Sequence, residues 1–97
     1  MTSHNKVAII TGAGSGIGKA TALAFLAAGY CVAFAGRRRD VLDKAIKEAG
    51  NNTSLAISVP TDVRDAESVK ALFSKTRSHF GRVDVVFNNA GISAPDV

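Results

Sequence analysis

The sequence predicts an α/β fold built on a parallel β-sheet, and three observations support this prediction. Four short apolar runs alternate with three segments whose apolar residues recur at helical spacing, which gives the order β-α-β-α-β-α-β. The strand-like runs are apolar almost throughout, so helices joined by right-handed crossovers should cover both faces of the sheet. Hydrophobic residues make up 46% of the 97 residues, enough to bury the core of one domain.

The first strand and the first helix are predicted at residues 7–10 and 17–28. The strand run is short and rich in β-branched residues, whereas the helical segment is rich in alanine and stops before Gly29. We expect the buried face of this helix to consist of Ile17, Thr21, Ala24 and Ala28.

The second strand is predicted at residues 31–35, and the apolar spacing of residues 42–49 predicts the second helix. Gly50 and the asparagine turn at residues 51–52 should close this helix. Asp40 should lie in its first turn, because a carboxylate at that end complements the helix dipole.

The remaining elements are a third strand, a third helix and a fourth strand. Residues 55–59 predict the third strand, which Pro60 should stop, and residues 83–87 predict the fourth. Asp65 is expected to cap the third helix at its start and Gly81 to end it. The expected buried positions of that helix are Val69, Leu72, Phe73, Thr76 and Phe80.

Composition argues against several classes of function. The formal net charge is +4, but the basic residues are scattered apart from residues 37–39, and there is no tryptophan, so we do not expect nucleic-acid binding. No apolar run approaches the roughly 20 residues of a membrane span, and the start of the chain does not resemble a signal peptide. The lone cysteine, Cys31, fits a small apolar strand residue in a reducing compartment. We therefore expect a cytoplasmic protein.

The turn after the first strand reads Thr-Gly-Ala-Gly-Ser-Gly-Ile-Gly at residues 11–18. It lies beyond the carboxyl end of a parallel strand, where ligands of such sheets bind. Glycine lets the backbone approach a ligand closely, and the following helix offers free N–H groups. A tight turn needs one or two glycines, and each further one costs about 0.5–1 kcal/mol relative to alanine. The four glycines therefore favour a pyrophosphate-binding turn over a purely structural one.

Two other phosphate-binding motifs do not fit this turn. A P-loop ending at residues 18–19 would need glycine and a hydroxyl residue where the chain has Ala13 and Ala20. The fingerprint G-x-G-x-x-G would need glycine at Ile17. The pattern that does fit is T-G-x-x-x-G-x-G, formed by Thr11, Gly12, Gly16 and Gly18.

Three motifs occur in order along the chain: the glycine turn at residues 11–18, Asp62-Val63 after the third strand, and the segment Asn-Asn-Ala-Gly at residues 88–91. Through them the chain resembles the N-terminal part of the short-chain dehydrogenase/reductase family. The resemblance implies a Rossmann-type parallel sheet, with residues 1–97 as the incomplete, NAD(P)-binding N-terminal half of a doubly wound domain. It also implies hydride transfer between a nicotinamide cofactor and a small carbonyl or alcohol substrate, in a complete protein that is a homodimer or homotetramer.

The same resemblance implies roles for individual residues. Asp62 would accept a hydrogen bond from the adenine amino group, Val63 would pack on the adenine ring, and Asn88 would steady the central sheet. The pyrophosphate and the adenosine ribose would be bordered by Gly12, Ser15, Gly16, Ile17 and Gly18. The adenosine and the nicotinamide side would be bordered by Asn89, Ala90 and Gly91. Without the family pattern, Asp62 is also compatible with a helix-entry residue and the asparagine pair with a simple turn.

The end of the second strand predicts NADP(H) rather than NAD(H). An NAD-binding unit keeps a carboxylate there, about 20 residues past the glycine turn, for the ribose 2′-hydroxyl. This chain has Gly36 at that position, which leaves room for a 2′-phosphate. Arg37 can offer that phosphate a guanidinium fork, with Arg38 as a second cofactor-binding cation. We expect Arg39 to be solvated and the competing carboxylate, Asp40, to serve the second helix.

No catalytic residue can be assigned in this sequence. The family's serine, its Tyr-x-x-x-Lys pair and a helical asparagine would all follow the fourth strand. Tyr30 has Phe34 where the lysine would stand, and His4 and His79 fit no metal or Ser/His/Asp pattern. We therefore expect the 97-residue chain alone to be inactive, as a cofactor-binding segment without its catalytic half. The alternative is a non-catalytic dinucleotide-binding module or a truncated product without turnover.

Overall fold

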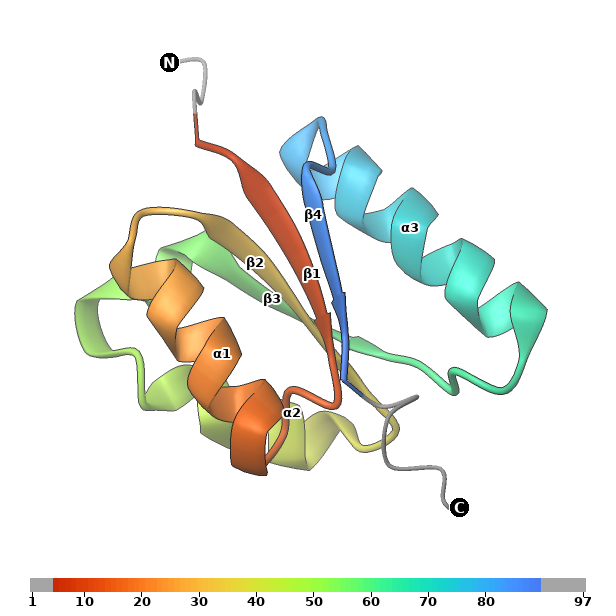
Figure 1. Ribbon diagram of the computed structural model, residues 1–97, viewed down its shortest axis with the longest axis horizontal. Helices are drawn as coiled ribbons and strands as arrows, with labels where there is room; N and C mark the ends of the chain where they lie inside the picture. Colours follow the sequence, from red (N-terminus) through yellow and green to blue (C-terminus); the bar gives the residue numbers. More distant parts are fainter. Residues whose placement is uncertain (1–4, 90–97) are drawn as a thin grey trace.

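A parallel β-sheet lies at the centre of the computed structural model, which describes residues 5–89 (Figure 1). Its four strands stand in the order β3-β2-β1-β4. The strands are β1 (Val7–Thr11), β2 (Cys31–Gly36), β3 (Ala56–Pro60) and β4 (Val85–Asn88). The chain therefore runs outward from β1 to β3 and then crosses to the other side of β1 for β4. This crossing confirms the predicted Rossmann-type α/β fold and creates a switch point at the carboxyl ends of the strands, where such sheets bind ligands.

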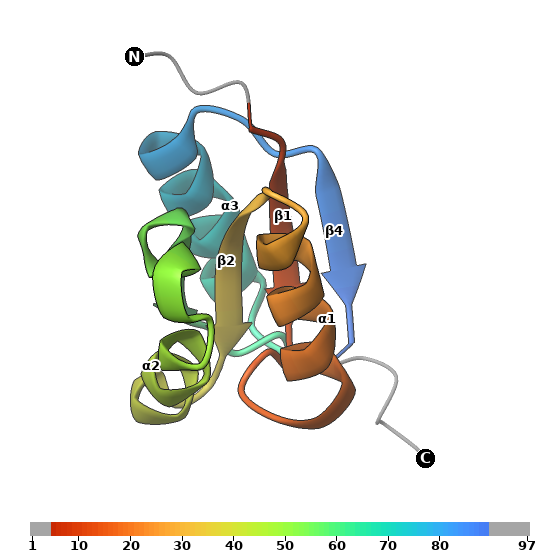
Figure 2. The ribbon, with the colours of Figure 1, turned by 90° about the vertical axis from the view of Figure 1, so that its left-hand side faces the viewer.

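The helices cover the two faces of the sheet unequally (Figures 1 and 2). Two of them, α1 (Gly16–Ala27) and α2 (Arg39–Lys47), pack on one face, and α3 (Ala66–Phe80) packs on the other. A 3-10 helix, η1 (Gly50–Leu55), connects α2 to β3. Each strand is thus covered by helix on at least one side, in agreement with the apolar runs of the sequence.

The hydrophobic core is split by the sheet into two clusters. In β1, Ala8 and Ile10 face α1 and α2, whereas Ile9 faces α3. All three side chains are fully buried, as is Phe34 on the α1 side. β1 therefore needs apolar residues from Val7 to Ile10, because successive side chains point to opposite faces and both faces are packed.

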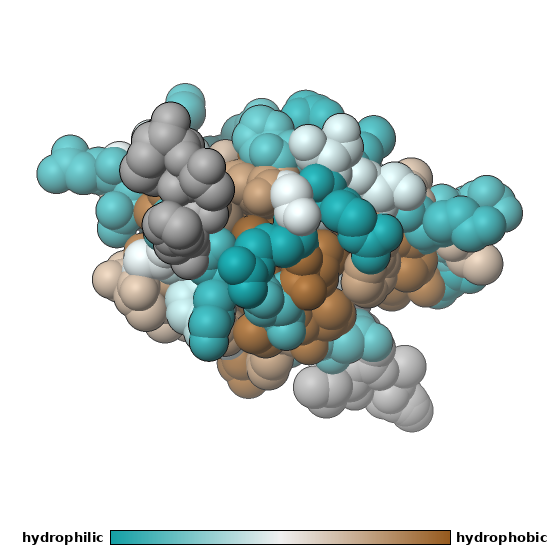
Figure 3. Space-filling view, turned by 90° about the horizontal axis from the view of Figure 1, so that it is seen from above, coloured by the Kyte–Doolittle hydropathy of each residue, from teal (hydrophilic) through white to brown (hydrophobic). Residues whose placement is uncertain are grey.

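Asp84 clamps the amino ends of β1 and β4 together. Its carboxylate accepts a hydrogen bond from the Val7 N–H at 2.8 Å, and its own N–H donates to the Val7 carbonyl at 2.8 Å. The Arg82 guanidinium donates to both carboxylate oxygens at 2.8 Å, and this pairing is the main cause that holds the pKa of Asp84 below its ordinary value. Seen from this end, a hydrophobic area in the middle of the face lies between hydrophilic residues (Figure 3).

The predicted buried face of α1 was wrong. The buried residues are Gly18, Ala22 and Leu26, and the side chain of Ile17 is 70% exposed. Gly18 faces inward because the helix begins directly against the glycine turn, where a side chain does not fit. The apolar pattern alone favoured the larger Ile17.

Several predicted boundaries also differ from those in the structure. The fourth strand begins at Val85 rather than two residues earlier, because the Val7 N–H is taken by the Asp84 side chain and the ladder starts at the pair Ala8 and Val85. The predicted turn at residues 51–52 is part of η1. The ends of α3 agree with prediction. Asp65 accepts a hydrogen bond from the Glu67 N–H, and Gly81 ends the helix with φ 91°.

Candidate functional site

The turn between β1 and α1 requires glycine at two positions for different reasons. Gly16, the first residue of α1, has φ 58°, a conformation that other residues adopt at a cost. Gly18 has no room for a side chain, because a Cβ atom there would lie 2.0 Å from the Gly12 carbonyl oxygen. The turn is also tied to the neighbouring strand through the Ala13 N–H, which donates to the Ala35 carbonyl at 3.1 Å. The glycine turn is therefore closely fitted to the start of α1.

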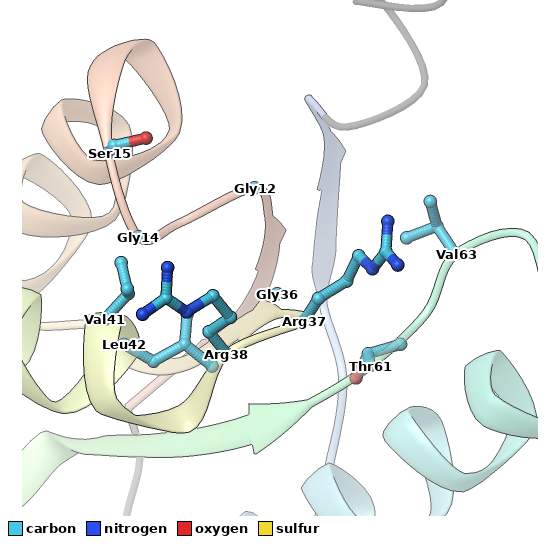
Figure 4. Close-up of a pocket in the computed structure, with 10 residues that line it drawn as sticks. All are labelled: Gly12, Gly14, Ser15, Gly36, Arg37, Arg38, Val41, Leu42, Thr61 and Val63. Atoms are coloured by element: carbon cyan, nitrogen blue, oxygen red, sulfur yellow. The ribbon is translucent and has the colours of Figure 1, made fainter.

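The first turn of α1 keeps its backbone N–H groups available. Ser15 is the N-cap residue, but its side chain makes no capping hydrogen bond, and the first turn of the helix contains no acidic residue. Uncapped N–H groups and the positive end of the helix dipole both favour an anion at this point. The exposed hydroxyl of Ser15 lies beside them on the wall of the cavity described next (Figure 4).

A cavity of about 270 Å³ opens next to this turn (Figure 4). Its walls come from the glycine turn, the end of β2, the start of α2 and the loop after β3. It brings together five residues that the sequence predicted for the cofactor site: Gly12, Ser15, Arg37, Arg38 and Val63. Gly36, which replaces the carboxylate of an NAD-binding unit, lies on the same wall.

Four further residues line this cavity that the sequence analysis did not assign to it: Gly14, Val41, Leu42 and Thr61. The turn packs so closely on α2 that a Cβ atom at Gly14 would lie 2.5 Å from Cγ1 of Val41. Leu42 is fully buried and also belongs to the hydrophobic core. Val41 and Leu42 look like ordinary core residues in the sequence, and only the packing of α2 against the turn gives them a surface toward the cavity.

The three consecutive arginines are in three different situations. Arg37 extends toward Val63, and it makes no hydrogen bond or ion pair within residues 5–89 (Figure 4). Arg38 pairs with Asp40 at 3.2 Å. Arg39 is exposed, as expected, but it is the first residue of α2, and its guanidinium donates to the Ser58 hydroxyl at 3.0 Å, which ties α2 to β3.

Asp62 stands just outside the cavity, beside Val63. Its carboxylate accepts hydrogen bonds from the backbone N–H of Arg64 at 3.0 Å and from the Arg64 guanidinium at 3.2 Å. The side-chain bond with Arg64 is the largest of the causes that hold the pKa of Asp62 below its ordinary value. The backbone N–H of Asp62 donates to the Ser68 hydroxyl at 2.9 Å, which fixes the loop to the start of α3. Asp62 is thus held as an ionised acceptor at the edge of the cavity.

The asparagines after β4 lie against the glycine turn. The Thr11 hydroxyl donates to the Asn88 side-chain oxygen at 3.0 Å, which links the carboxyl ends of β1 and β4. The amide nitrogen of the Asn89 side chain lies so close to Gly18 that a Cβ atom there would be 3.0 Å from it. The predicted site residues Ala90 and Gly91 lie outside the described residues.

Tyr30 is placed away from this site. It precedes β2, at the opposite end of that strand from the cavity, and packs edge to face on Phe25 with ring centroids 4.8 Å apart. Over residues 5–89 there is no group of three or more histidine, cysteine or acidic side chains that could hold a metal ion. The same residues contain no helix long and apolar enough to cross a membrane.

The chain matches known proteins over nearly its whole length. The family model for short chain dehydrogenases covers residues 6–97. An uncharacterized oxidoreductase of Listeria monocytogenes is 46% identical over 92 residues, which make up 95% of this chain and 37% of that protein. The 3-oxoacyl-(acyl-carrier-protein) reductase of Thermotoga maritima is 39% identical over 93 residues, or 96% of this chain and 38% of that protein. The chain thus spans little more than a third of the length of these curated relatives.

Solved structures show the same similarity, again over about a third of the other chain. Actinorhodin polyketide ketoreductase, solved with NADPH, aligns with a TM-score of 0.83 at 32% identity, over 92% of this chain and 34% of that one. The 3-ketoacyl-(acyl-carrier-protein) reductase of Brucella melitensis, solved with NADH, aligns with a TM-score of 0.76 at 34% identity, over 87% of this chain and 34% of that one. Both nicotinamide cofactors therefore occur among the structural neighbours.

Proposed function

This chain belongs to the short chain dehydrogenase family, and from that premise we propose that the complete protein is an oxidoreductase that transfers a hydride between NADP(H) and a small carbonyl or alcohol substrate. Residues 1–97 supply the part of it that binds the cofactor. The observation that carries this proposal is the cavity beside the glycine turn, with Gly36 and Arg37 where an NAD-binding unit has its carboxylate.

The residues present fit a dinucleotide with a 2′-phosphate. At Gly18 a Cβ atom would collide with the Gly12 carbonyl oxygen, so the turn and α1 are in close contact. Such a contact suits a site in which backbone N–H groups bind a pyrophosphate. The uncapped N–H groups of α1 are suited to a pyrophosphate anion. Arg37 is exposed and unpaired within residues 5–89, so its guanidinium is available to a phosphate.

Each part of the site then has a task in cofactor binding. The start of α1 binds the pyrophosphate, and Arg37, assisted by Arg38, binds the 2′-phosphate. Asp62 orients the adenine by accepting from its amino group, and Val63 excludes water from one face of its ring. Asn89, with Ala90 and Gly91, borders the adenosine and nicotinamide side. When bound, the cofactor supplies or accepts the hydride.

The acid/base chemistry of the reaction is assigned to residues outside this chain. Within residues 5–89, the only tyrosine packs on Phe25 and faces away from the cavity, so it cannot reach a substrate beside the cofactor. We propose a homodimer or homotetramer for the complete protein, as the family implies, and a cytoplasmic location, because the sequence has a single cysteine, Cys31, which is buried in β2 as a small strand residue.

The NADP(H) preference is tested by titrating NADPH and NADH into the complete protein and its Arg37→Ala variant. Charge-assisted hydrogen bonds contribute about 1.5–3 kcal/mol, so the variant should lose about 10- to 100-fold in NADPH affinity and little in NADH affinity. Arg77→Ala, which removes an exposed arginine from α3 on the other face of the sheet, is the control for net charge. An unchanged ratio of the NADPH and NADH affinities would show that Arg37 does not bind the 2′-phosphate.

A second measurement separates the enzyme from the alternative, a dinucleotide-binding module without turnover. The same protein is assayed for NADPH oxidation with a panel of ketones and aldehydes. Turnover with any of them supports the oxidoreductase. Tight NADPH binding without turnover across the panel would favour the binding module.

A further inference from the structure

We propose that Asp40 is a specificity-determining residue that limits the preference for NADPH by holding Arg38. The inference rests on the proposed function, because it concerns the 2′-phosphate end of the same cavity. It assigns opposite effects on NADPH affinity to two side chains: Arg38 raises this affinity and Asp40 lowers it.

The ion pair itself is the first observation. Nη2 of Arg38 lies 3.2 Å from Oδ2 of Asp40, and both side chains are 72% exposed. Arg38 lines the cavity, and its side chain lies over the start of α2, beside Val41 and Leu42 (Figure 4). A phosphate that approaches Arg38 therefore also approaches the carboxylate of Asp40.

Arg37 provides the comparison within the same segment. Its side chain also lines the cavity, but it extends toward Val63 and has no carboxylate partner at ion-pair distance within residues 5–89. After the hydrogen bonds from Arg64, the charge of Arg37 also helps to lower the pKa of Asp62, but the side chains of Arg37 and Asp62 form no ion pair. Arg38, in contrast, is in direct contact with Asp40. Of the two adjacent arginines that line the cavity, only Arg38 is held in an ion pair.

The start of α2 is the second positive feature that Asp40 offsets. Arg38 is the N-cap residue of this helix and its side chain makes no capping hydrogen bond, so the first N–H groups of α2 have no side-chain acceptor. Asp40 is the acidic residue in the first turn, where it complements the positive end of the helix dipole. A 2′-phosphate would use the same positive end and therefore competes with Asp40 for it.

The expected effect is specific to the phosphate. A ribose 2′-hydroxyl carries no charge, so a nearby carboxylate repels NADPH much more than NADH. Because the pair is exposed, water and salt screen the repulsion, and we expect a change in NADPH affinity of about three- to tenfold. The preference for NADPH is then moderate in this protein and would rise when Asp40 is neutralised.

The test compares Asp40→Asn with Asp43→Asn in the complete protein. Both substitutions remove one exposed carboxylate from α2, but only Asp40 is paired with an arginine of the cavity. NADPH and NADH are titrated into each variant at low and at high salt. We expect Asp40→Asn to tighten NADPH binding about three- to tenfold at low salt, to leave NADH within about twofold, and to lose this gain at high salt. The same tightening in Asp43→Asn would overturn the proposal, because it would reflect net charge alone.

Two further variants protect the test against indirect effects on α2. Asp40→Ser removes the same charge with a different side chain, and it should give the same increase in NADPH affinity as Asp40→Asn. In an Arg38→Ala background, Asp40→Asn should have a smaller effect on the ratio of the two affinities, because part of the effect acts through Arg38. Fully additive effects would overturn the role of Arg38.

The outcomes separate this inference from the proposed function. If the unmodified protein binds neither NADPH nor NADH, the proposed function is wrong and the inference fails with it. If it binds NADPH through Arg37, but Asp40→Asn and Asp40→Ser leave the ratio of the affinities unchanged, only the inference is wrong.

Discussion

The two ends of this sheet use charged residues in opposite ways. At the amino ends of β1 and β4, the Asp84 carboxylate accepts hydrogen bonds from the Val7 N–H and from two nitrogens of the Arg82 guanidinium. At the carboxyl ends, the start of α1 is uncapped and Arg37 has no ion-pair partner within residues 5–89. The contacts of Asp84 stabilise the fold, whereas the start of α1 and the side chain of Arg37 remain available to a ligand. Residues that stabilise the fold and residues available to a ligand thus lie at opposite ends of the same strands.

Gly18→Ala should have the largest effect, and it tests the binding role of the carboxyl end of the sheet. The new Cβ atom would lie 2.0 Å from the Gly12 carbonyl oxygen, so the turn and α1 must move apart. We expect a loss of about 2–4 kcal/mol in the free energy of unfolding and the loss of measurable NADPH binding. Chemical denaturation and NADPH fluorescence titration measure the two effects.

Gly50→Ala is the matched control for that variant. Gly50 also has a positive φ, of 61°, but a Cβ atom there would meet nothing within 4 Å. It should cost about 1 kcal/mol of stability through backbone strain and leave NADPH binding unchanged. Normal NADPH affinity in Gly18→Ala would contradict the close fit between turn and helix.

A smaller effect is expected from Asp84→Asn, which tests the amino end. This variant loses the ion pair with Arg82 and the charge that strengthens the bond to the Val7 N–H, so its melting temperature should fall. Its NADPH affinity should not change, because Asp84 lies at the other end of the sheet from the cavity. Asp43→Asn, an exposed substitution on α2, should leave the melting temperature close to that of the unmodified protein.

The same variant should show a defined pH dependence. The pKa of Asp84 is lowered in the folded state, so its contribution to stability is present above the ordinary aspartate pKa of about 3.9. That contribution is lost as the pH falls through the lower, folded pKa. The difference in melting temperature between Asp84→Asn and the unmodified protein should therefore persist from pH 7 to about pH 4 and shrink below it. A difference independent of pH over this range would assign the effect to something other than the charge of Asp84.

Local chemistry made much of the fold predictable. Alternation of β-branched runs with helical spacing predicted the order of the elements, and Asp65 and Gly81 predicted the ends of α3, because capping acts within a few residues. The buried face of α1 was not predictable in this way. It depends on the contact between Gly18 and the Gly12 carbonyl, and the hydrophobicity of Ile17 pointed to the wrong face.

The candidate site was predictable where a motif carried it and not where packing did. The glycine turn, Arg37 and Val63 were identified from the sequence and line one cavity. Val41 and Thr61 were missed, because only the packing of α2 and of the loop after β3 brings them to that cavity. The sequence placed Arg37 before Arg38 as the phosphate ligand, but it did not reveal the ion pair of Arg38 with Asp40.

Backbone hydrogen exchange of the complete protein, with and without NADPH, tests the separation of the two ends most directly. The account predicts that NADPH slows exchange at residues 12–18, 36–41 and 61–63, and leaves residues 82–85 at the amino end unchanged. Equal protection at both ends, or protection confined to residues 82–85, would contradict the claim that the carboxyl end binds the cofactor while the amino end stabilises the fold.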